Sequence, residues 1–229
     1  MHPLTFQKEK WPDEIPFEPY HFERLDPLPD GLFYALPRLV YHIDEPAVAA
    51  LTQYYRQSIS PGSDILDVCS SWVSHYPVEF PSIMGRIAAT GLNYIELALN
   101  NQLTKGDFQV VDLNQNPKLP YPDASFDVVT IALSIDYLSH PIAVLREIDR
   151  ILRPGGKCIC SFSNRCFVTK AIRIWRDSRS ERHLEFVNAF FQYAGGYEEP
   201  RSAYEITAQL PTPKYQDPMF VVEATKEAI

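Results

Sequence analysis

Residues 119–163 read "LPYPDASFDVVTIALSIDYLSHPIAVLREIDRILRPGGKCICSFS". Within this stretch, "FDVVTIALSI" (126–135) is almost continuously apolar, as expected for a strand buried on both faces of a sheet. "PIAVLREIDRIL" (141–152) has the spacing of an amphipathic helix, which "RPGGK" ends with proline and glycine. "KCICSFS" (157–163) is a further strand. A strand, a helix and a strand in this order predict a right-handed crossover between parallel strands.

The same alternation precedes this stretch. We expect strands at "DILDVC" (64–69), "GRIAATGLN" (85–93) and "FQVVDLN" (108–114), with a helix at "IELALNNQL" between the last two. Near the end of the chain, "AYEITAQL" and "MFVVEATK" are strand-like and only "PTPKYQD" separates them, which is too short for a helical crossover. The prediction is an α/β, Rossmann-like, mostly parallel seven-stranded sheet with helices on both faces and a C-terminal antiparallel hairpin.

The first part of the chain has a different composition. Residues 1–40 are rich in proline and aromatic side chains, so we expect an extended arm whose aromatic rings pack on the body. Residues 41–229 form the α/β domain, which begins with a helix capped by Asp44. Val48, Leu51 and Tyr55 fall on one face of this helix.

Composition limits the classes of partner. The chain has 229 residues and a formal net charge of −8, which disfavours a nucleic-acid partner because phosphate binding needs a basic face. We find no apolar run long enough to span a membrane and no secretory signal at the start. Four cysteines suggest a reducing compartment, so the cytoplasm, or an organellar stroma or matrix, is the expected location.

The quoted stretch closely resembles class I S-adenosylmethionine-dependent methyltransferases, particularly the type 11 group. That group combines an "LPFPD-x-SFD" segment, a buried strand, an amphipathic helix, "LRPGG" and another strand. A weaker similarity extends from about residue 41 to the final hairpin. The resemblance implies S-adenosylmethionine as cofactor, held across the carboxyl ends of the first three strands.

The implied cofactor positions depart from the family pattern in two places. Aligned on Asp67, the three glycine positions of the first motif hold Cys69, Ser71 and Val73. The acidic residue that binds the ribose hydroxyls is replaced by Asn93, whereas the acidic residue that reads the adenine is retained as Asp112. The cofactor-binding residues that we predict are Asp67, Cys69, Ser70, Ser71, Trp72, Asn93, Asp112, Leu113 and Ser134.

The segment "SSWVSHYP" (70–77) is rich in hydroxyl, aromatic and imidazole groups, which favours an altered, working site over a dead one. The candidate catalytic residues are His75, His42 and Tyr34. The alternative for His75 is a histidine that is hydrogen-bonded within its loop, and the alternative for His42 and Tyr34 is that they tie the arm to the sheet. The candidate substrate-binding residues are Arg38, Asp136, Tyr137, Asn164 and Arg165. We predict no metal site, because no cysteine or histidine pair has zinc spacing.

Two functions follow from these observations. The first is an S-adenosylmethionine-dependent methyltransferase that transfers a methyl group by in-line displacement to a small-molecule acceptor. The alternative is a non-catalytic, methyltransferase-like binding or regulatory protein, which the missing glycines and Asn93 favour. The oligomeric state and the methylated atom are left open.

Overall fold

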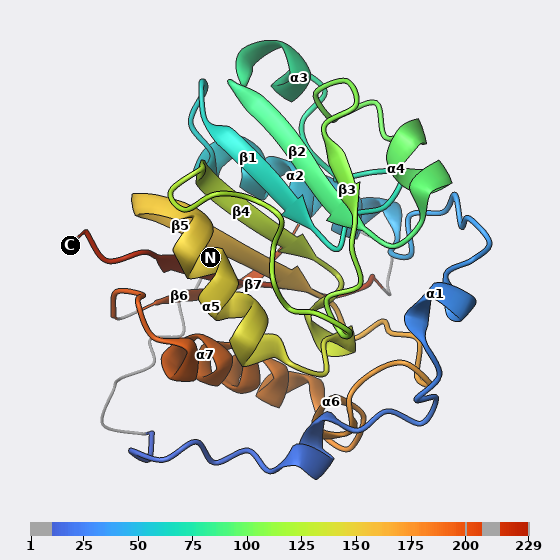
Figure 1. The fold of residues 1–229 in the computed structure, drawn as a ribbon, viewed down its shortest axis with the longest axis vertical. Helices are drawn as coiled ribbons and strands as arrows, with labels where there is room; N and C mark the ends of the chain where they lie inside the picture. The colour runs from blue at the N-terminus through green and yellow to red at the C-terminus, as the bar shows by residue number, and fades with distance from the viewer. Residues whose placement is uncertain (1–10, 200, 208–215, 229) are drawn as a thin grey trace.

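The computed structural model describes residues 11–199, 201–207 and 216–228, and its centre is a seven-stranded sheet (Figure 1). The strand order is β3-β2-β1-β4-β5-β7-β6. The first five strands are parallel, and β7 runs antiparallel to both β5 and β6. The strands are β1 (Asp64–Val68), β2 (Arg86–Gly91), β3 (Phe108–Val110), β4 (Phe126–Ala132), β5 (Leu152–Phe162), β6 (Ser202–Ile206) and β7 (Met219–Thr225).

This sheet confirms the predicted fold class, including the antiparallel pair at the C-terminus. Residues 208–215, which contain most of the predicted hairpin connection, lie outside the described residues. The order reverses direction between β1 and β4, which creates a crevice at the carboxyl ends of these strands.

Some boundaries differ from the predicted ones. β5 begins at Leu152 because the "RPGG" segment pairs beside β4 through a bulge. Gly156 permits this pairing, since a Cβ there would meet the Asp127 carbonyl oxygen at 2.9 Å. β3 ends at Val110 instead of residue 114, because the Asp112 carboxylate accepts the backbone N–H of Asn114 and turns the chain.

Helices cover both faces of the sheet. On one face, α2 packs against Ile65, Ile87 and Val128 of the strands. On the other face, α5 and α7 pack against Leu66 and Val129 (Figure 1). The helices are α1 (Asp30–Phe33), α2 (Glu45–Ser58), α3 (Phe80–Ile83), α4 (Tyr94–Leu99), α5 (Pro141–Ile151), α6 (Arg173–Arg176) and α7 (His183–Ala194), with 3₁₀ turns η2 (Pro19–Phe22), η3 (Ile135–Tyr137) and η4 (Ser180–Arg182).

The arm, from residue 11 to α2, runs along α7 and α6 and then up the side of the sheet to α1 (Figure 1). Phe17 and Phe22 lie against Phe190 of α7, with ring centroids 5.2 and 5.9 Å away. The arm enters α2 through Asp44, whose carboxylate accepts the Ala47 N–H at 2.9 Å as the sequence predicts. The aromatic contacts bring residues 30–43 to the carboxyl edge of the sheet. In the described part of the chain, no helix is both long and apolar enough to cross a membrane.

Candidate functional site

A cavity of about 310 Å³ lies where β1, β2, β3 and β4 end, and the arm closes one side of it. Ligands of open α/β sheets bind at this edge. The predicted site residues that line the cavity are Tyr34, Arg38, His42, Asp67, Cys69, Ser70, Ser71, His75, Asn93, Asp112, Leu113, Ser134, Tyr137 and Arg165. Trp72, Asp136 and Asn164 are not part of the lining.

The turn after β1 forms without glycine. Cys69 has a φ of 58°, the left-handed conformation that glycine adopts most easily. The N–H of Ser70 donates to the Thr90 carbonyl at 2.7 Å and ties the turn to β2. Gly91 permits this approach, since a Cβ at that position would collide with the Ser70 carbonyl oxygen. The turn therefore keeps a glycine-like backbone at its first position while presenting a thiol.

Unusual backbone conformations gather around the cavity. His42, Cys69, His75 and Leu133 all have positive φ angles between 54° and 65°, and all four line the cavity. Non-glycine residues in this region cost roughly 1 kcal/mol or more each, and such residues cluster at functional sites. This clustering favours a cavity that is shaped for a ligand.

Asp67 anchors a buried polar network at the end of β1. Its Oδ1 accepts from the Thr130 hydroxyl at 3.1 Å, and that hydroxyl lies 2.6 Å from the Tyr76 hydroxyl. Burial raises the pKa of Asp67 to about 6, while the hydroxyls of Ser70, Ser74 and Thr130 oppose the rise. At neutral pH this carboxyl is therefore mostly ionised and faces the cavity.

The two candidate histidines are neutral at neutral pH. Burial, with a smaller effect of His42, lowers the pKa of His75 to about 4. Partial burial also lowers the pKa of His42. The Nδ1 atom of His75 is buried and has no hydrogen-bond partner among the described residues. A neutral imidazole in this position can accept a proton or a hydrogen bond from a ligand.

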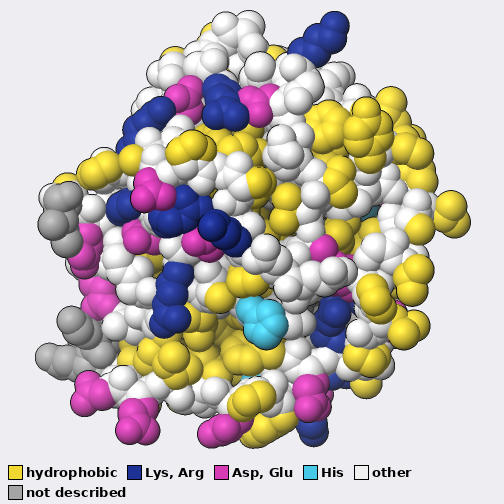
Figure 2. All heavy atoms as spheres, in the orientation of Figure 1, with side chains coloured by type: hydrophobic (Ala, Val, Ile, Leu, Met, Phe, Trp, Pro, Cys, Tyr) yellow, Lys and Arg dark blue, Asp and Glu magenta, His cyan; other side chains and the backbone are white. Residues whose placement is uncertain are grey.

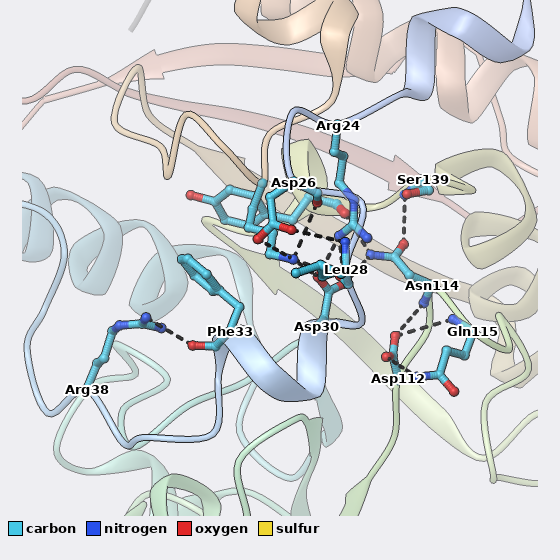
Figure 3. Close-up of polar contacts among 12 residues, drawn as sticks. Arg24, Asp26, Leu28, Asp30, Phe33, Arg38, Asp112, Asn114, Gln115 and Ser139 are labelled. Carbon is cyan, nitrogen blue, oxygen red and sulfur yellow. Dashed lines mark hydrogen bonds and ion pairs between the residues drawn. The ribbon is translucent and has the colours of Figure 1, made fainter.

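Arg38 of the arm is surrounded by aromatic rings. Its guanidinium carbon lies 4.4 Å from the ring centroid of Phe33, 5.2 Å from that of Phe167 and 5.6 Å from that of Tyr34. Nη2 donates to the Phe33 carbonyl at 3.0 Å (Figure 3), and Nη1 is buried without a partner in the described structure. Burial raises the pKa of Tyr34 well above its usual value, so that hydroxyl stays protonated.

The side chain of Asn93 connects the N-terminus of α4 with the arm. Its Oδ1 accepts the N–H groups of Ile95 and Glu96 and so caps α4. Its Nδ2 donates to the carbonyls of Tyr34 at 2.8 Å and Ala35 at 3.3 Å. An amide has two donor hydrogens and two acceptor lone pairs, so every hydrogen-bonding position of this side chain is used.

Glu96 lies one helical turn further on and also lines the cavity. Its side chain is buried, with 8% of the residue exposed. Oε1 accepts the Arg38 N–H at 2.6 Å, and Oε2 accepts the Ser71 hydroxyl at 2.7 Å. This carboxylate therefore joins the turn after β1, the start of α4 and the arm.

Asp112 and Asn114 connect the end of β3 with the arm (Figure 3). Asp112 Oδ1 accepts the Asn114 N–H at 3.0 Å, and Oδ2 accepts from Gln115 Nε2 at 2.9 Å. The amide of Asn114 in turn donates to Asp30 at 2.8 Å and to the Tyr137 carbonyl at 2.9 Å. Asp112 lines the cavity, and its loop is held in place by a residue of the arm.

Asp30 belongs to an ion-pair cluster that fixes the arm (Figure 3). It pairs with Arg24 at 2.6 Å and with Lys170 at 3.2 Å, and Lys170 also pairs with Asp26 at 3.0 Å. Burial alone would raise the pKa of Asp30, but Arg24, Asn114 and Lys170 outweigh it and lower the pKa. Lys170 is completely buried, and its ion pairs with these carboxylates offset the cost of removing the ammonium group from water.

The residues after β4 and β5 form the opposite wall. The hydroxyl of Ser134 donates to the Ala132 carbonyl at 2.8 Å, and the hydroxyl of Tyr137 accepts the Phe167 N–H at 2.8 Å. Arg165 reaches the rim and pairs with Asp217 at 2.7 Å. This wall offers aromatic surface with few charged groups.

The three residues outside the lining have other surroundings. The indole of Trp72 donates to the Val40 carbonyl at 3.1 Å and so holds the arm. Asp136 is buried, which raises its pKa to about 8, and its Oδ2 lacks a partner among the described residues. Asn164 is exposed.

The cysteines do not form a reactive or metal-binding group. Burial raises the pKa of Cys69 to about 12, so its thiol is protonated at neutral pH. Cys158 and Cys160 are buried in β5. Within the ranges that the structure describes, no cluster of three or more histidine, cysteine or acidic side chains could hold a metal ion.

The lining also contains residues that sequence reasoning missed, among them Asp30, Thr90, Glu96 and Phe167. Glu96 follows the cap residue Asn93 by three positions, the capping-box spacing, and this was the available signal. Thr90 lies inside an apolar strand, and Phe167 lies within the loop after β5, so neither carries a local signal.

The lining fits a nucleoside-containing ligand such as S-adenosylmethionine. Three buried polar atoms of lining residues lack a partner in the described structure: Thr90 Oγ1, His75 Nδ1 and Arg38 Nη1. Buried polar groups are normally hydrogen-bonded, so these atoms indicate a polar ligand. The carboxylates of Asp67, Glu96 and Asp112 suit one that also carries a positive charge.

Comparison with known proteins supports this interpretation. The methyltransferase domain family Methyltransf_11 matches residues 80–160. A methyltransferase from Haloferax volcanii, solved in complex with the activator Trm112, has a TM-score of 0.59 at 18% identity, covering 79% of this chain and 89% of that one. A methyltransferase from Aquifex aeolicus has a TM-score of 0.56 at 18% identity, covering 78% and 91%. The fold is therefore that of class I S-adenosylmethionine-dependent methyltransferases, and residues 80–160 match the type 11 methyltransferase domain family, which confirms the resemblance.

Two curated relatives are similar over part of their length. A demethylmenaquinone methyltransferase from Listeria monocytogenes is 33% identical over 107 residues, which is 44% of this chain and 45% of that protein. A ubiquinone/menaquinone biosynthesis C-methyltransferase from Chromobacterium violaceum is 32% identical over 94 residues, covering 40% and 35%. The chain thus matches less than half the length of these relatives.

Proposed function

We propose that this chain is an S-adenosylmethionine-dependent methyltransferase that acts on a small-molecule acceptor. The observation that carries the proposal is the cavity at the carboxyl ends of β1, β2, β3 and β4, on this fold and closed by the arm. When bound, the cofactor supplies an electrophilic methyl group on a sulfonium. The remaining tasks of binding, orientation and water exclusion fall to residues of the chain.

The cofactor side comprises the ends of the first three strands. Asp67 and the turn at Cys69 lie at β1, Thr90 at β2, and Asp112 at β3. The Asp112 carboxylate is aligned by its own loop and has lone pairs left to accept from an adenine amino group. An ionised Asp67 attracts the positive end of the ligand.

The acceptor side is aromatic. Tyr34, Tyr137 and Phe167 line the cavity, and a flat apolar acceptor suits such walls. Figure 2 shows hydrophobic side chains gathered over the region where Figure 1 places α4 and α1. The quinone methyltransferases among the relatives support an aromatic acceptor for this chain as well.

His75 has the protonation state that an acceptor hydroxyl needs. Because it is neutral at neutral pH, its free Nδ1 can accept a hydrogen bond from such a hydroxyl, orient it for in-line attack and take up its proton as the oxygen bonds to the methyl group. A closed arm excludes water from the reacting groups.

A non-catalytic binding protein is the second candidate, and one observation favours it. All hydrogen-bonding positions of the Asn93 amide are used by the arm and by the N-terminus of α4. The usual ribose contact of the family is therefore missing at that position. A chain that binds the cofactor without transferring methyl groups would show binding but no turnover with any acceptor.

Calorimetric titration with S-adenosylmethionine and S-adenosylhomocysteine tests the proposal. We expect micromolar binding of both, and Asp112→Ala should weaken both at least tenfold, because a hydrogen bond to a charged group contributes about 1.5–3 kcal/mol. Asp13→Asn, an exposed change in the arm, is the matched control and should leave both affinities unchanged. Absence of binding to the unmodified chain would contradict the methyltransferase proposal and leave a non-catalytic protein that uses the fold without the cofactor. Binding without turnover across a panel of hydroxylated aromatic acceptors would favour a non-catalytic protein that keeps the cofactor.

A further inference from the structure

Glu96 is a buried carboxylate without a cationic partner. Within the described ranges it forms no ion pair, and its two oxygens accept only from the Arg38 N–H and the Ser71 hydroxyl. Both donors are neutral. A carboxylate offers about four acceptor sites, so two of its sites are unused and it lines the cavity. Buried carboxylates are costly unless further donors reach them, which indicates that a ligand supplies donors here.

The other carboxylates of the cavity have different surroundings. Asp30 is neutralised by Arg24 and Lys170. Asp67 lies at the end of β1 and is bonded to Thr130. Asp112 lies at the end of β3. Glu96 is therefore the carboxylate beside the end of β2. In the sheet, β2 lies between β1, which ends next to Asp67, and β3, which ends near Asp112.

We propose that Glu96 binds the two ribose hydroxyls of the nucleoside ligand, in place of the acidic residue that position 93 lacks. This inference rests on the proposed function, because it assigns the sugar contact of the same cofactor. Asn93 has no hydrogen-bonding position left for a sugar, but it caps α4 and thereby fixes the first turn that carries Glu96. The ribose contact has moved by one helical turn, and the amide at 93 holds the arm instead.

A ligand and a side chain can be changed together to test this contact. S-Adenosylhomocysteine and its 2′,3′-dideoxy analogue would be titrated calorimetrically into the unmodified chain and into Glu96→Gln. We expect the unmodified chain to prefer the hydroxylated ligand at least tenfold, as two charge-assisted hydrogen bonds require. In Glu96→Gln this preference should fall to about twofold or less, because the amide has no negative charge and presents one acceptor oxygen in place of two.

Two variants control the measurement. Glu45→Gln makes the same change in the first turn of α2, at an exposed position, and should keep the preference for the hydroxylated ligand. Asp112→Asn should weaken both ligands by the same factor, because its contact is with the base. If Glu96→Gln does not fold, as judged by thermal unfolding without ligand, Glu96→Asp withdraws the carboxylate by one methylene and should also lose the preference.

The outcomes separate the two proposals. A tenfold preference that persists in Glu96→Gln or Glu96→Asp would overturn the assignment of Glu96 and leave the methyltransferase proposal intact. Failure of the unmodified chain to bind either ligand would overturn the proposed function itself.

Discussion

At the scale of single residues, the cavity replaces the usual chemistry of its fold with other side chains. Cys69 adopts a backbone conformation that suits glycine. Asn93 stands at the position where the resemblance implies an acidic residue that binds the ribose hydroxyls, and it donates to the arm instead. Both substitutions are visible in the sequence, but their consequences are not. The bond from Asn93 to Tyr34 joins residues 59 positions apart, so no local pattern could indicate it.

Asp136 gives a prediction about pH and stability. Burial raises its pKa to about 8 in the folded chain, against about 4 in an unfolded chain. Between these values the folded chain retains a proton that the unfolded chain has lost, so stability falls as pH rises from about 4 to about 8 and is then constant. Asp136→Asn has no carboxyl proton to lose, so its free energy of unfolding should lack this fall with pH. At pH 8.5 its melting temperature should exceed that of the unmodified chain, by about 2–4 °C for each kcal/mol of difference in the free energy of unfolding.

Thermal unfolding at pH 5, 7 and 8.5 measures the effect. The difference between the two chains should grow with pH, because Asp67 and His75 titrate equally in both. Asp13→Asn, on the exposed part of the arm, should follow the unmodified chain at every pH. Parallel curves for Asp136→Asn and the unmodified chain would refute the burial argument.

At the scale of elements, the arm is the part that completes the cavity. Arg24, Asp26, Asp30 and Lys170 form a cluster with two charges of each sign, in which Asp30 and Lys170 are buried and Asp26 is partly exposed. Asn114 connects this cluster to the loop of Asp112. The sequence predicts the arm from its prolines and aromatic residues. The cluster could not be predicted, because Lys170 lies at least 140 residues from its partners Asp26 and Asp30 along the chain.

Lys170→Met should loosen the arm. The change keeps the length of the side chain but leaves Asp26 and Asp30 with a single buried cation, and breaking a buried ion pair costs about 3–5 kcal/mol. Trypsin should then cleave after Arg24 or Arg38 at least about tenfold faster, because local opening becomes more frequent. Limited proteolysis followed by mass spectrometry reports the cleaved bonds.

Lys118→Met, at an exposed position, is the matched control and should leave the cleavage rate in the arm unchanged. Equal rates for Lys170→Met and the unmodified chain would mean that aromatic packing alone holds the arm, through Phe17 and Phe22 against α7.

At the scale of the whole molecule, the sheet was the most predictable feature. The apolar run at 126–135 and the crossover to 157–163 indicated parallel strands, and the short connection before 219 indicated the antiparallel edge. The cavity was predictable in its location, since it follows from the ends of neighbouring strands. Its individual contacts depend on the arm, which approaches from the other end of the chain and leaves no periodic pattern.

A crystal structure of the chain grown with S-adenosylhomocysteine tests the central claim most directly. The account predicts the ligand across the carboxyl ends of β1, β2 and β3, with the adenine beside Asp112 and the ribose hydroxyls within hydrogen-bond distance of Glu96. A ligand bound elsewhere, or a cavity that stays empty at saturating concentration, would contradict it.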